Sequence, residues 1–145
     1  MIDLRKIIQG QLKAIHPRVY FQMAPKTATF PYLVYDIPTI NDDGEGYQLA
    51  TIDIDGWDMT DDTTALETLM QTVNNALNKK SFVHNNTTLT PFLESKLSLR
   101  NDDEAKLKRR KNIYQGRIFR ADKSTWDIYA EKTWDIYAEK TWNNI

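Results

Sequence analysis

The segment that decides the fold runs from residue 47 to residue 80 and reads YQLATIDIDGWDMTDDTTALETLMQTVNNALNKK. In its first part apolar and polar residues alternate: Ala50, Ile52 and Ile54 fall on one face, and Asp53 and Asp55 fall on the other. Because side chains of a strand point alternately to the two faces of a sheet, this pattern predicts a strand with one buried face.

The second part of this segment has helical spacing. Its apolar residues form one stripe, as in an amphipathic helix: Leu66, Leu69, Met70, Val73 and Leu77. The first turn has Thr64 and Glu67 at capping-box spacing, and Lys79 and Lys80 follow at the negative end of the helix dipole. The segment therefore predicts a strand followed by a helix that packs on the apolar face of its sheet.

Upstream, a first helix is predicted from apolar residues at helical spacing, which are Leu4, Ile7, Ile8, Leu12 and Ile15. Pro17 ends this helix because proline disfavours helical geometry in the residue before it. A short strand over 18–22 follows, and then PYLVYDIP at 31–38, a central strand bounded by two prolines. The segment TINDDGEG at 39–46 has the composition of a turn or an exposed loop.

Downstream, FLESKLSLR at 92–100 alternates again, with Leu93, Leu97 and Leu99 on one side. A last strand is predicted over 112–121, and the charged segment 101–111 is expected to form the exposed, mobile tip of a long hairpin. The predicted order is α-β-β-β-α-β-β. It defines an α+β fold, in which two α-helices pack on a mixed or antiparallel β-sheet of about four to five strands.

The end of the chain contains a repeat. TWDIYAEK occurs at 125–132 and again at 133–140, and TWNNI begins a third copy. Because the period is even, an extended chain places Trp126 and Trp134 on one face together with the isoleucines. One strand over the tract would span roughly 60 Å at ~3.3 Å per residue, longer than a domain of this size. The tract therefore folds back, leaves the domain as an arm, or is a disordered duplication. We expect a domain over 1–122 and a separate C-terminal tract over 123–145.

Composition limits the functions that the chain can have. Its 145 residues fit one domain, and 19 basic against 20 acidic side chains exclude a strongly basic nucleic-acid-binding protein. With no cysteine, disulfides, thiolate metal sites and a cysteine nucleophile are excluded. The N-terminus lacks the apolar run of a signal peptide, and no apolar run is long enough to cross a membrane, so we expect a protein that acts without a membrane.

No pattern in the sequence predicts an enzyme. The two histidines, His16 and His84, have no metal-site spacing; His16 is expected at the C-terminal end of the first helix, where positive charge is favoured. The run DIDGWD resembles a calcium loop, but its glycine is misplaced and no glutamate closes it. Walker A, GxGxxG, GxSxG and HExxH patterns are all missing. We expect no catalytic residue, cofactor or metal.

One concentrated basic run, KLKRRK at 106–111, allows two interpretations. It contains Lys106, Lys108, Arg109, Arg110 and Lys111. The first interpretation is a solvated hairpin tip balanced by the acids at 102–104. The second is contact with an acidic protein surface or with DNA phosphates, which would attract the run without reading sequence.

The ordered features resemble the tail-completion, or tail-terminator, proteins of long-tailed bacteriophages, a group related to the tail-to-head joining protein of phage SPP1. The resemblance rests on the opening helix MIDLRKIIQGQLKAI, on RVYFQMAPKTATFPYLVYDIP, on TIDIDGWD and on TTALETLMQTVNNALN, with RIFRAD fitting as a late strand. Together these cover residues 1 to about 122. The repeated TWDIYAEK tract is not part of the resemblance.

The resemblance implies a structural subunit of the virion head–tail junction, assembled in the host cytoplasm. Such proteins form a homo-oligomeric ring, expected to be a hexamer, which terminates the tail tube and joins the tail to the head connector. The implied partners are further copies, the major tail tube protein, a connector or head-completion protein, and DNA that passes through the channel without sequence recognition.

In a ring, one face of each subunit meets a different face of the next. The acidic side chains Asp53 and Asp55 and the basic run are candidate opposite partners, and the apolar row with Trp126 and Trp134 could add to the sheet edge of a neighbour. A head-closure or minor tail or capsid protein, and a DNA-binding accessory protein, are the alternative functions.

Overall fold

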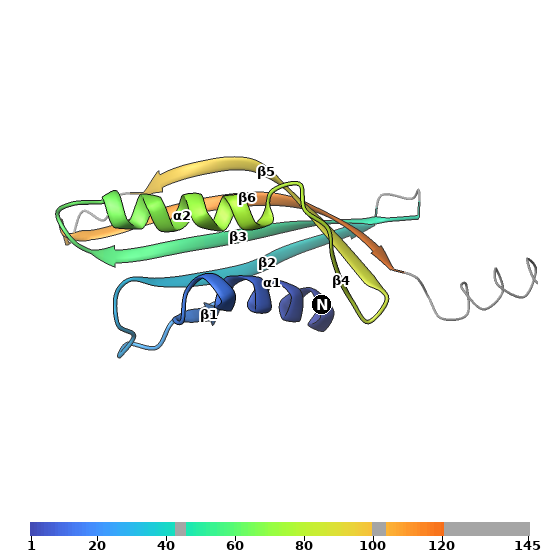
Figure 1. The fold of residues 1–145 in the computed structure, drawn as a ribbon, viewed down its shortest axis with the longest axis horizontal. Helices are drawn as coiled ribbons and strands as arrows, with labels where there is room; N and C mark the ends of the chain where they lie inside the picture. The colour runs from blue at the N-terminus through green and yellow to red at the C-terminus, as the bar shows by residue number, and fades with distance from the viewer. Residues whose placement is uncertain (43–45, 100–103, 121–145) are drawn as a thin grey trace, which may run out of the picture.

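The computed structural model describes residues 1–42, 46–99 and 104–120, which form two helices and one sheet (Figure 1). The elements, in chain order, are α1 (Ile2–Ile15), β1 (Val19–Phe21), β2 (Tyr32–Asp42), β3 (Gln48–Met59), α2 (Thr64–Leu77), β4 (Phe82–His84), β5 (Thr87–Leu99) and β6 (Leu107–Arg120). No helix in this part of the chain is long and apolar enough to cross a membrane.

The sheet has six strands in the order β1-β2-β3-β6-β5-β4. β1 pairs with β2 in parallel and all other neighbours are antiparallel, so the sheet is mixed, which is one of the two predicted alternatives. The predicted count of four to five strands is wrong, because Phe82–His84 form an additional short strand, β4, after α2. Asn85 and Asn86, both with positive φ, make the tight turn that reverses the chain into β5. Asparagine adopts this conformation more readily than most residues.

Both helices pack on the same face of the sheet, and one apolar core lies between the two layers (Figure 1). The predicted helix stripes supply it, through Leu4, Ile7, Ile8 and Leu12 of α1 and Leu66, Met70, Val73 and Leu77 of α2. In β3 the predicted residues Ala50, Ile52 and Ile54 are buried, and so is Asp58, which was not predicted. Gly56 continues that row: a Cβ atom there would lie 2.6 Å from Met70 Sδ and 2.9 Å from Leu66 Cδ1. α2 therefore packs closely on β3 at Gly56, because glycine has no side chain that would separate the two elements.

α2 begins in a different way from the predicted capping box. Its N-cap is Thr63, which makes no side-chain hydrogen bond, and Asp62 Oδ1 instead accepts hydrogen bonds from the Thr64 amide at 2.9 Å and the Thr64 hydroxyl at 2.6 Å. An aspartate at this end also stabilises the helix dipole. The spacing of Thr64 and Glu67 correctly predicted the start of a helix. The side chain that accepts the hydrogen bonds there, however, is that of Asp62.

β2 is longer than predicted, because it continues through Pro38 to Asp42. The register between β2 and β3 shifts between Asp36 and Thr39, so Pro38 lies in an irregularity of the ladder. β1 pairs with β2 only as far as Tyr35, so this part of β2 lies at the edge of the sheet. Proline is tolerated in strands at such positions, because its missing amide hydrogen is not needed there.

The predicted long hairpin is present as β5 and β6, but its two arms differ from prediction. A bulge between Leu93 and Ser95 breaks the alternation of β5: Leu93 pairs with Tyr114 on the helix-covered face, whereas Leu97 pairs with Lys111 on the opposite face. The basic run is also not a tip, since β6 starts at Leu107 and its cations pair along β3 and β5. Of the predicted tip, residues 101–103 lie outside the described residues.

Candidate subunit interface

The face of the sheet opposite the two helices carries four of the predicted site residues; we call it the helix-free face. Its composition follows from the register, because directly paired residues point to the same side. Asp53 and Asp55 of β3 lie there, and Arg109 and Lys111 of β6 lie beside them, since Arg109 pairs with Trp57 and Lys111 pairs with Asp55. The sequence-predicted acidic and basic residues are therefore brought together within one chain, rather than held on separate surfaces.

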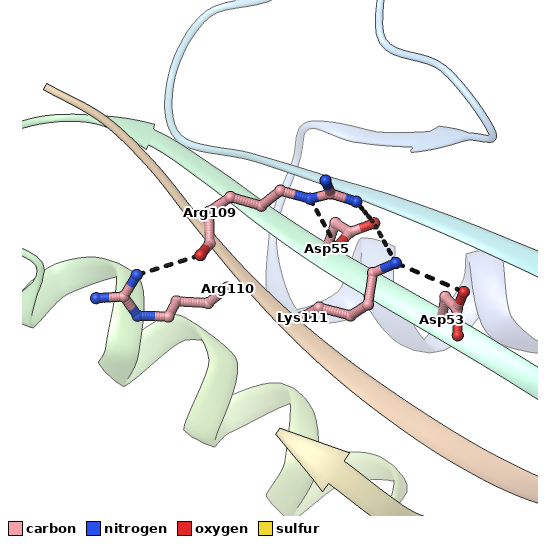
Figure 2. Close-up of polar contacts among 5 residues, drawn as sticks. All are labelled: Asp53, Asp55, Arg109, Arg110 and Lys111. Carbon is pink, nitrogen blue, oxygen red and sulfur yellow. Dashed lines mark hydrogen bonds and ion pairs between the residues drawn. The ribbon is translucent and has the colours of Figure 1, made fainter. Parts of the chain in front are cut away.

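Side-chain contacts make these four residues one ionic cluster (Figure 2). Arg109 donates from Nε to Asp55 Oδ1 at 3.2 Å and from Nη2 to Asp55 Oδ2 at 3.3 Å, a two-point contact. Lys111 Nζ lies 3.7 Å from Asp53 Oδ2 and 3.9 Å from Asp55 Oδ2. The Asp55 and Lys111 side chains are only 13% and 19% exposed, so this pairing is shielded from solvent more than a surface ion pair is.

Asp53 is the member of the cluster whose carboxylate is least well satisfied by hydrogen bonds and opposite charge. Its Oδ1 atom is buried and has no hydrogen-bond partner. Burial raises the pKa of this carboxyl above its ordinary value, Lys111 opposes the shift, and the nearby carboxylates Asp55 and Asp36 add to it. Asp53 and Asp55 were predicted to be an exposed strand face; the structure instead shows them half-buried beneath the long cationic side chains of β6.

Aromatic side chains extend the cluster toward β1, and sequence reasoning did not select them. The Arg109 guanidinium lies 4.8 Å from the centroid of the Trp57 ring, and Trp57 stacks on Tyr32 at 6.4 Å. Tyr32 in turn meets Tyr20 edge-on at 5.9 Å. The signal that would have found Trp57 is the alternation itself, because Trp57 shares the odd-numbered positions of Asp53 and Asp55.

The helix-free face also exposes apolar side chains. Val83 is 71% exposed, Phe119 52%, Met59 42% and Leu97 40%. Their pairing partners place all four on this face: Val83 is opposite Thr88, Thr88 is opposite Phe119, and Met59 is opposite Leu107. Among the described residues that the register places on this face, three are carboxylates, Asp36, Asp53 and Asp55, and three are cations, Arg109, Lys111 and Arg117. A neutral face with exposed apolar groups is suited to contact with protein.

The other residues of the basic run have separate environments. Arg110 points to the helix-covered face, where its Nη2 donates to Glu67 Oε1 at 3.4 Å and its Nη1 donates to the Arg109 carbonyl at 3.1 Å (Figure 2). Lys108 Nζ donates to the Ala105 carbonyl. Within the part of the chain that the structure describes, neither Lys106 nor Lys108 forms an ion pair. Trp126 and Trp134, also predicted interface residues, lie outside the described residues.

The histidines and carboxylates form no metal site in the described ranges, where no group of three or more ligating side chains is found. His16 does follow the end of α1, and its Nε2 contacts the Pro31 carbonyl at 2.8 Å, which joins the helix end to the start of β2. His84 Nε2 lies 3.9 Å from Asp3 Oδ1 and so joins β4 to α1. Both histidines therefore make contacts between elements of the fold.

The fold and its helix-free face define an α+β protein whose conspicuous surface combines exposed apolar side chains with an ionic cluster. No protein-family model matches the chain, and no curated protein sequence is significantly similar to it. Among solved structures, the fold is similar to that of a chain in the virion of a native gene transfer agent (GTA) particle. The TM-score is 0.65 at 16% sequence identity, and the match covers 80% of this chain and 94% of that chain. At this identity the likeness establishes a shared fold.

Proposed function

We propose that the protein is a structural subunit of a phage or phage-like virion, and that it forms a ring, expected to be hexameric, at the end of the tail tube. The ring terminates the tube and joins the tail to the head connector. The proposal includes no reaction, no cofactor and no recognition of DNA sequence; DNA passes through the channel of the ring.

The observation that carries the proposal is the fold likeness. The match extends over 94% of a chain that is itself part of a virion, so the shared architecture is a whole domain rather than a common local motif. The sequence resemblance to tail-completion proteins points independently to the same class of particle. Fold alone does not define function, so the surface must agree with the assignment.

The helix-free face agrees with it. Ring subunits need surfaces that bind protein, and such surfaces combine exposed apolar side chains with polar groups. Met59, Leu97 and Phe119 supply the apolar part. The ionic cluster supplies fixed polar groups whose charges are already neutralised within the chain, so burying them against a neighbour leaves no unpaired charge. Among the described side chains of the cluster, only the buried Asp53 Oδ1 atom lacks a hydrogen-bond partner.

The same pairing speaks against a DNA-binding accessory protein. Attraction to phosphates requires uncompensated cations. Arg109, Arg110 and Lys111 each contact a carboxylate of the same chain. Lys106 and Lys108 remain for such a role.

Native mass spectrometry and electron microscopy of the full chain, alone and with tail tube protein, test the proposal. We expect a discrete closed ring, with six copies as its main form, that caps the tube ends. Replacement of Met59 and Phe119 by glutamate should prevent capping, while Ile2→Glu, at an exposed position on α1, should not.

Other outcomes separate the alternatives. A chain that joins the head but never a tube end would indicate a head-closure protein, and incorporation along the tail without capping would indicate a minor tail protein. DNA affinity that falls steeply with salt, and that is lost in Lys106→Ala/Lys108→Ala, would indicate the accessory protein. A chain that enters no multi-subunit particle would overturn the proposal.

A further inference from the structure

One edge of the sheet is open over part of its length. β4 pairs with β5 only from Thr87 to Leu89. The connection after α2 then closes the next stretch, because the Lys79 amide donates to the Pro91 carbonyl at 2.7 Å and Asn78 Oδ1 accepts from the Leu93 amide at 2.8 Å. From residue 95 to residue 99, no strand in the described ranges pairs with β5 on this side. An unpaired edge of this kind is a template for an added strand.

A groove runs beside the open stretch. It lies between α2 and the end of β5, encloses about 270 Å³, and is lined in part by Met70, Gln71, Lys96 and Arg110. A strand edge beside a helix is the arrangement in which extended peptides bind by adding to a sheet, with main-chain hydrogen bonds giving affinity and alternate side chains giving specificity.

The two sides of this edge differ in chemistry. Toward the groove the edge presents Lys96, whose Nζ donates to the amide oxygen of Gln71 at 3.1 Å. Behind it on β6 lies Arg110, which contacts the exposed Glu67. Toward the helix-free face it presents Leu97, which is 40% exposed, and Leu99. An added strand that fits would carry acidic residues on one side and apolar residues on the other.

The C-terminal repeat has this pattern. In TWDIYAEK the even-numbered positions include Trp126 and Ile128, and the odd-numbered positions include Asp127 and Glu131. Because the period of eight is even, the second copy repeats both rows on the same sides. Each copy would extend about 26 Å at ~3.3 Å per residue, which is enough to cover residues 95–99.

We propose that the TWDIYAEK tract of one copy of this protein adds as a strand to the open edge of β5 in a second copy. Its Trp/Ile row lies over Leu97 and Leu99, and its acidic row faces Lys96 beside the groove. β6 ends at Arg120 opposite Thr87, at the far end of β5 from the open stretch, so the tract leaves the body away from its own docking site. The inference rests on the proposed assembly function and names the contact between neighbouring copies.

Site-directed disulfide formation tests it cleanly because the chain has no cysteine. Full-length Leu97→Cys, grown with a heavy isotope, is mixed with unlabelled Ile128→Cys or, in parallel, Ile136→Cys, and oxidised. We expect a mixed heavy–light dimer from at least one of the two pairs. Val83→Cys is the matched control, because it is an exposed apolar position on the helix-free face at the other end of the sheet edge.

A second variant checks the groove side. Lys96→Glu, introduced into the Leu97→Cys chain, should lower the cross-linking yield about two- to fivefold because it faces the acidic row with a like charge. Unchanged far-ultraviolet circular dichroism and melting temperature confirm that both exposed substitutions leave the fold intact.

The inference is overturned if neither pair forms a mixed dimer, or if Val83→Cys forms it equally well. Ring formation is measured separately by native mass spectrometry. A six-fold ring without the cross-link would overturn the docking of the tract and leave the proposed function standing. The cross-link without any ring would support the docking and overturn the ring.

Discussion

The two faces of the sheet are built from the same strands but are filled in different ways. On the helix-covered face, Ile52, Ile54 and Leu89 are fully buried, and the packing of α1 and α2 determines which side chains fit. On the helix-free face, two alternate positions of the same β3 hold Asp53 and Asp55, which are neutralised by cations from β6. One face holds the fold together and the other is left uncovered by helices, which is the division that the proposed function requires.

The largest difference between the two faces should appear in the loss of stability when one side chain on each face is replaced by alanine. Ile54→Ala removes a fully buried side chain and leaves a cavity between β3 and α2, so we expect a loss of about 2–5 kcal/mol in the free energy of unfolding. Leu97→Ala, at a 40% exposed position on the helix-free face, should lose less than about 1 kcal/mol. Urea denaturation measures both. Equal losses would mean that the helix-free face is also a core.

The next largest effect concerns a polar network on the helix-covered face. The buried Tyr114 hydroxyl donates to Asn74 Oδ1 at 3.1 Å and accepts from Asn112 Nδ2 at 3.1 Å. Tyr114→Phe leaves both amides without this partner, so we expect a loss of about 1–3 kcal/mol in unfolding free energy.

The same tyrosine makes a prediction at high pH. Burial raises the pKa of Tyr114 from 10.0 to about 12. In the unfolded chain the hydroxyl ionises first, so the unfolded state binds fewer protons and stability falls as pH rises from 10 toward 12. Tyr114→Phe should show a smaller fall over that interval in denaturation experiments. An identical fall in both proteins would contradict the buried hydroxyl.

A smaller effect is expected for the ionic cluster. A double-mutant cycle with Asp55→Ala and Arg109→Ala should give a coupling free energy of about 0.5–1 kcal/mol, since Arg109 keeps 32% of its side chain exposed. Arg109→Lys should recover only part of it, because lysine cannot make the two-point contact. A coupling free energy of zero would mean that the contact between Asp55 and Arg109 does not stabilise the fold.

The smallest effect is a titration. Because burial raises the pKa of Asp53, its carboxyl should titrate in NMR above the ordinary 3.8, and Lys111→Met should move it higher still. Asp62, whose pKa is lowered by its hydrogen bonds to Thr64, is the internal control and should titrate below 3.8. The folded state holds the Asp53 proton longer, so this residue lowers stability as pH rises from 3.8 through its folded pKa. Asp53→Asn should therefore gain in relative stability over that interval.

Much of the core was predictable because burial on the helix-covered face follows simple periodicity. The helix stripes and the buried row Ala50, Ile52, Ile54 were read correctly, since each depends on spacing within one segment. The errors arose where one residue changes the register. The bulge after Leu93 reverses the faces of Leu97 and Leu99, and no local pattern marks it. Pro38 was taken as a strand end because the edge position that tolerates it is a property of the whole sheet.

The candidate site was predicted in its members and not in its geometry. Asp53, Asp55 and the basic run were selected from the sequence, but as partners on neighbouring copies. Their contact within one chain follows from β6 lying next to β3, a pairing between segments more than fifty positions apart in sequence. Trp57 was missed, although its place in the alternation was visible.

The sequence by itself determined the two helices, the apolar face of β3 and the absence of cysteine chemistry, because composition and local periodicity depend on neighbouring residues alone. The tertiary structure decided which charges meet, which apolar side chains stay exposed and which stretch of edge is open. Those properties depend on strand order and register, and both are set by the sum of many weak contacts between distant segments.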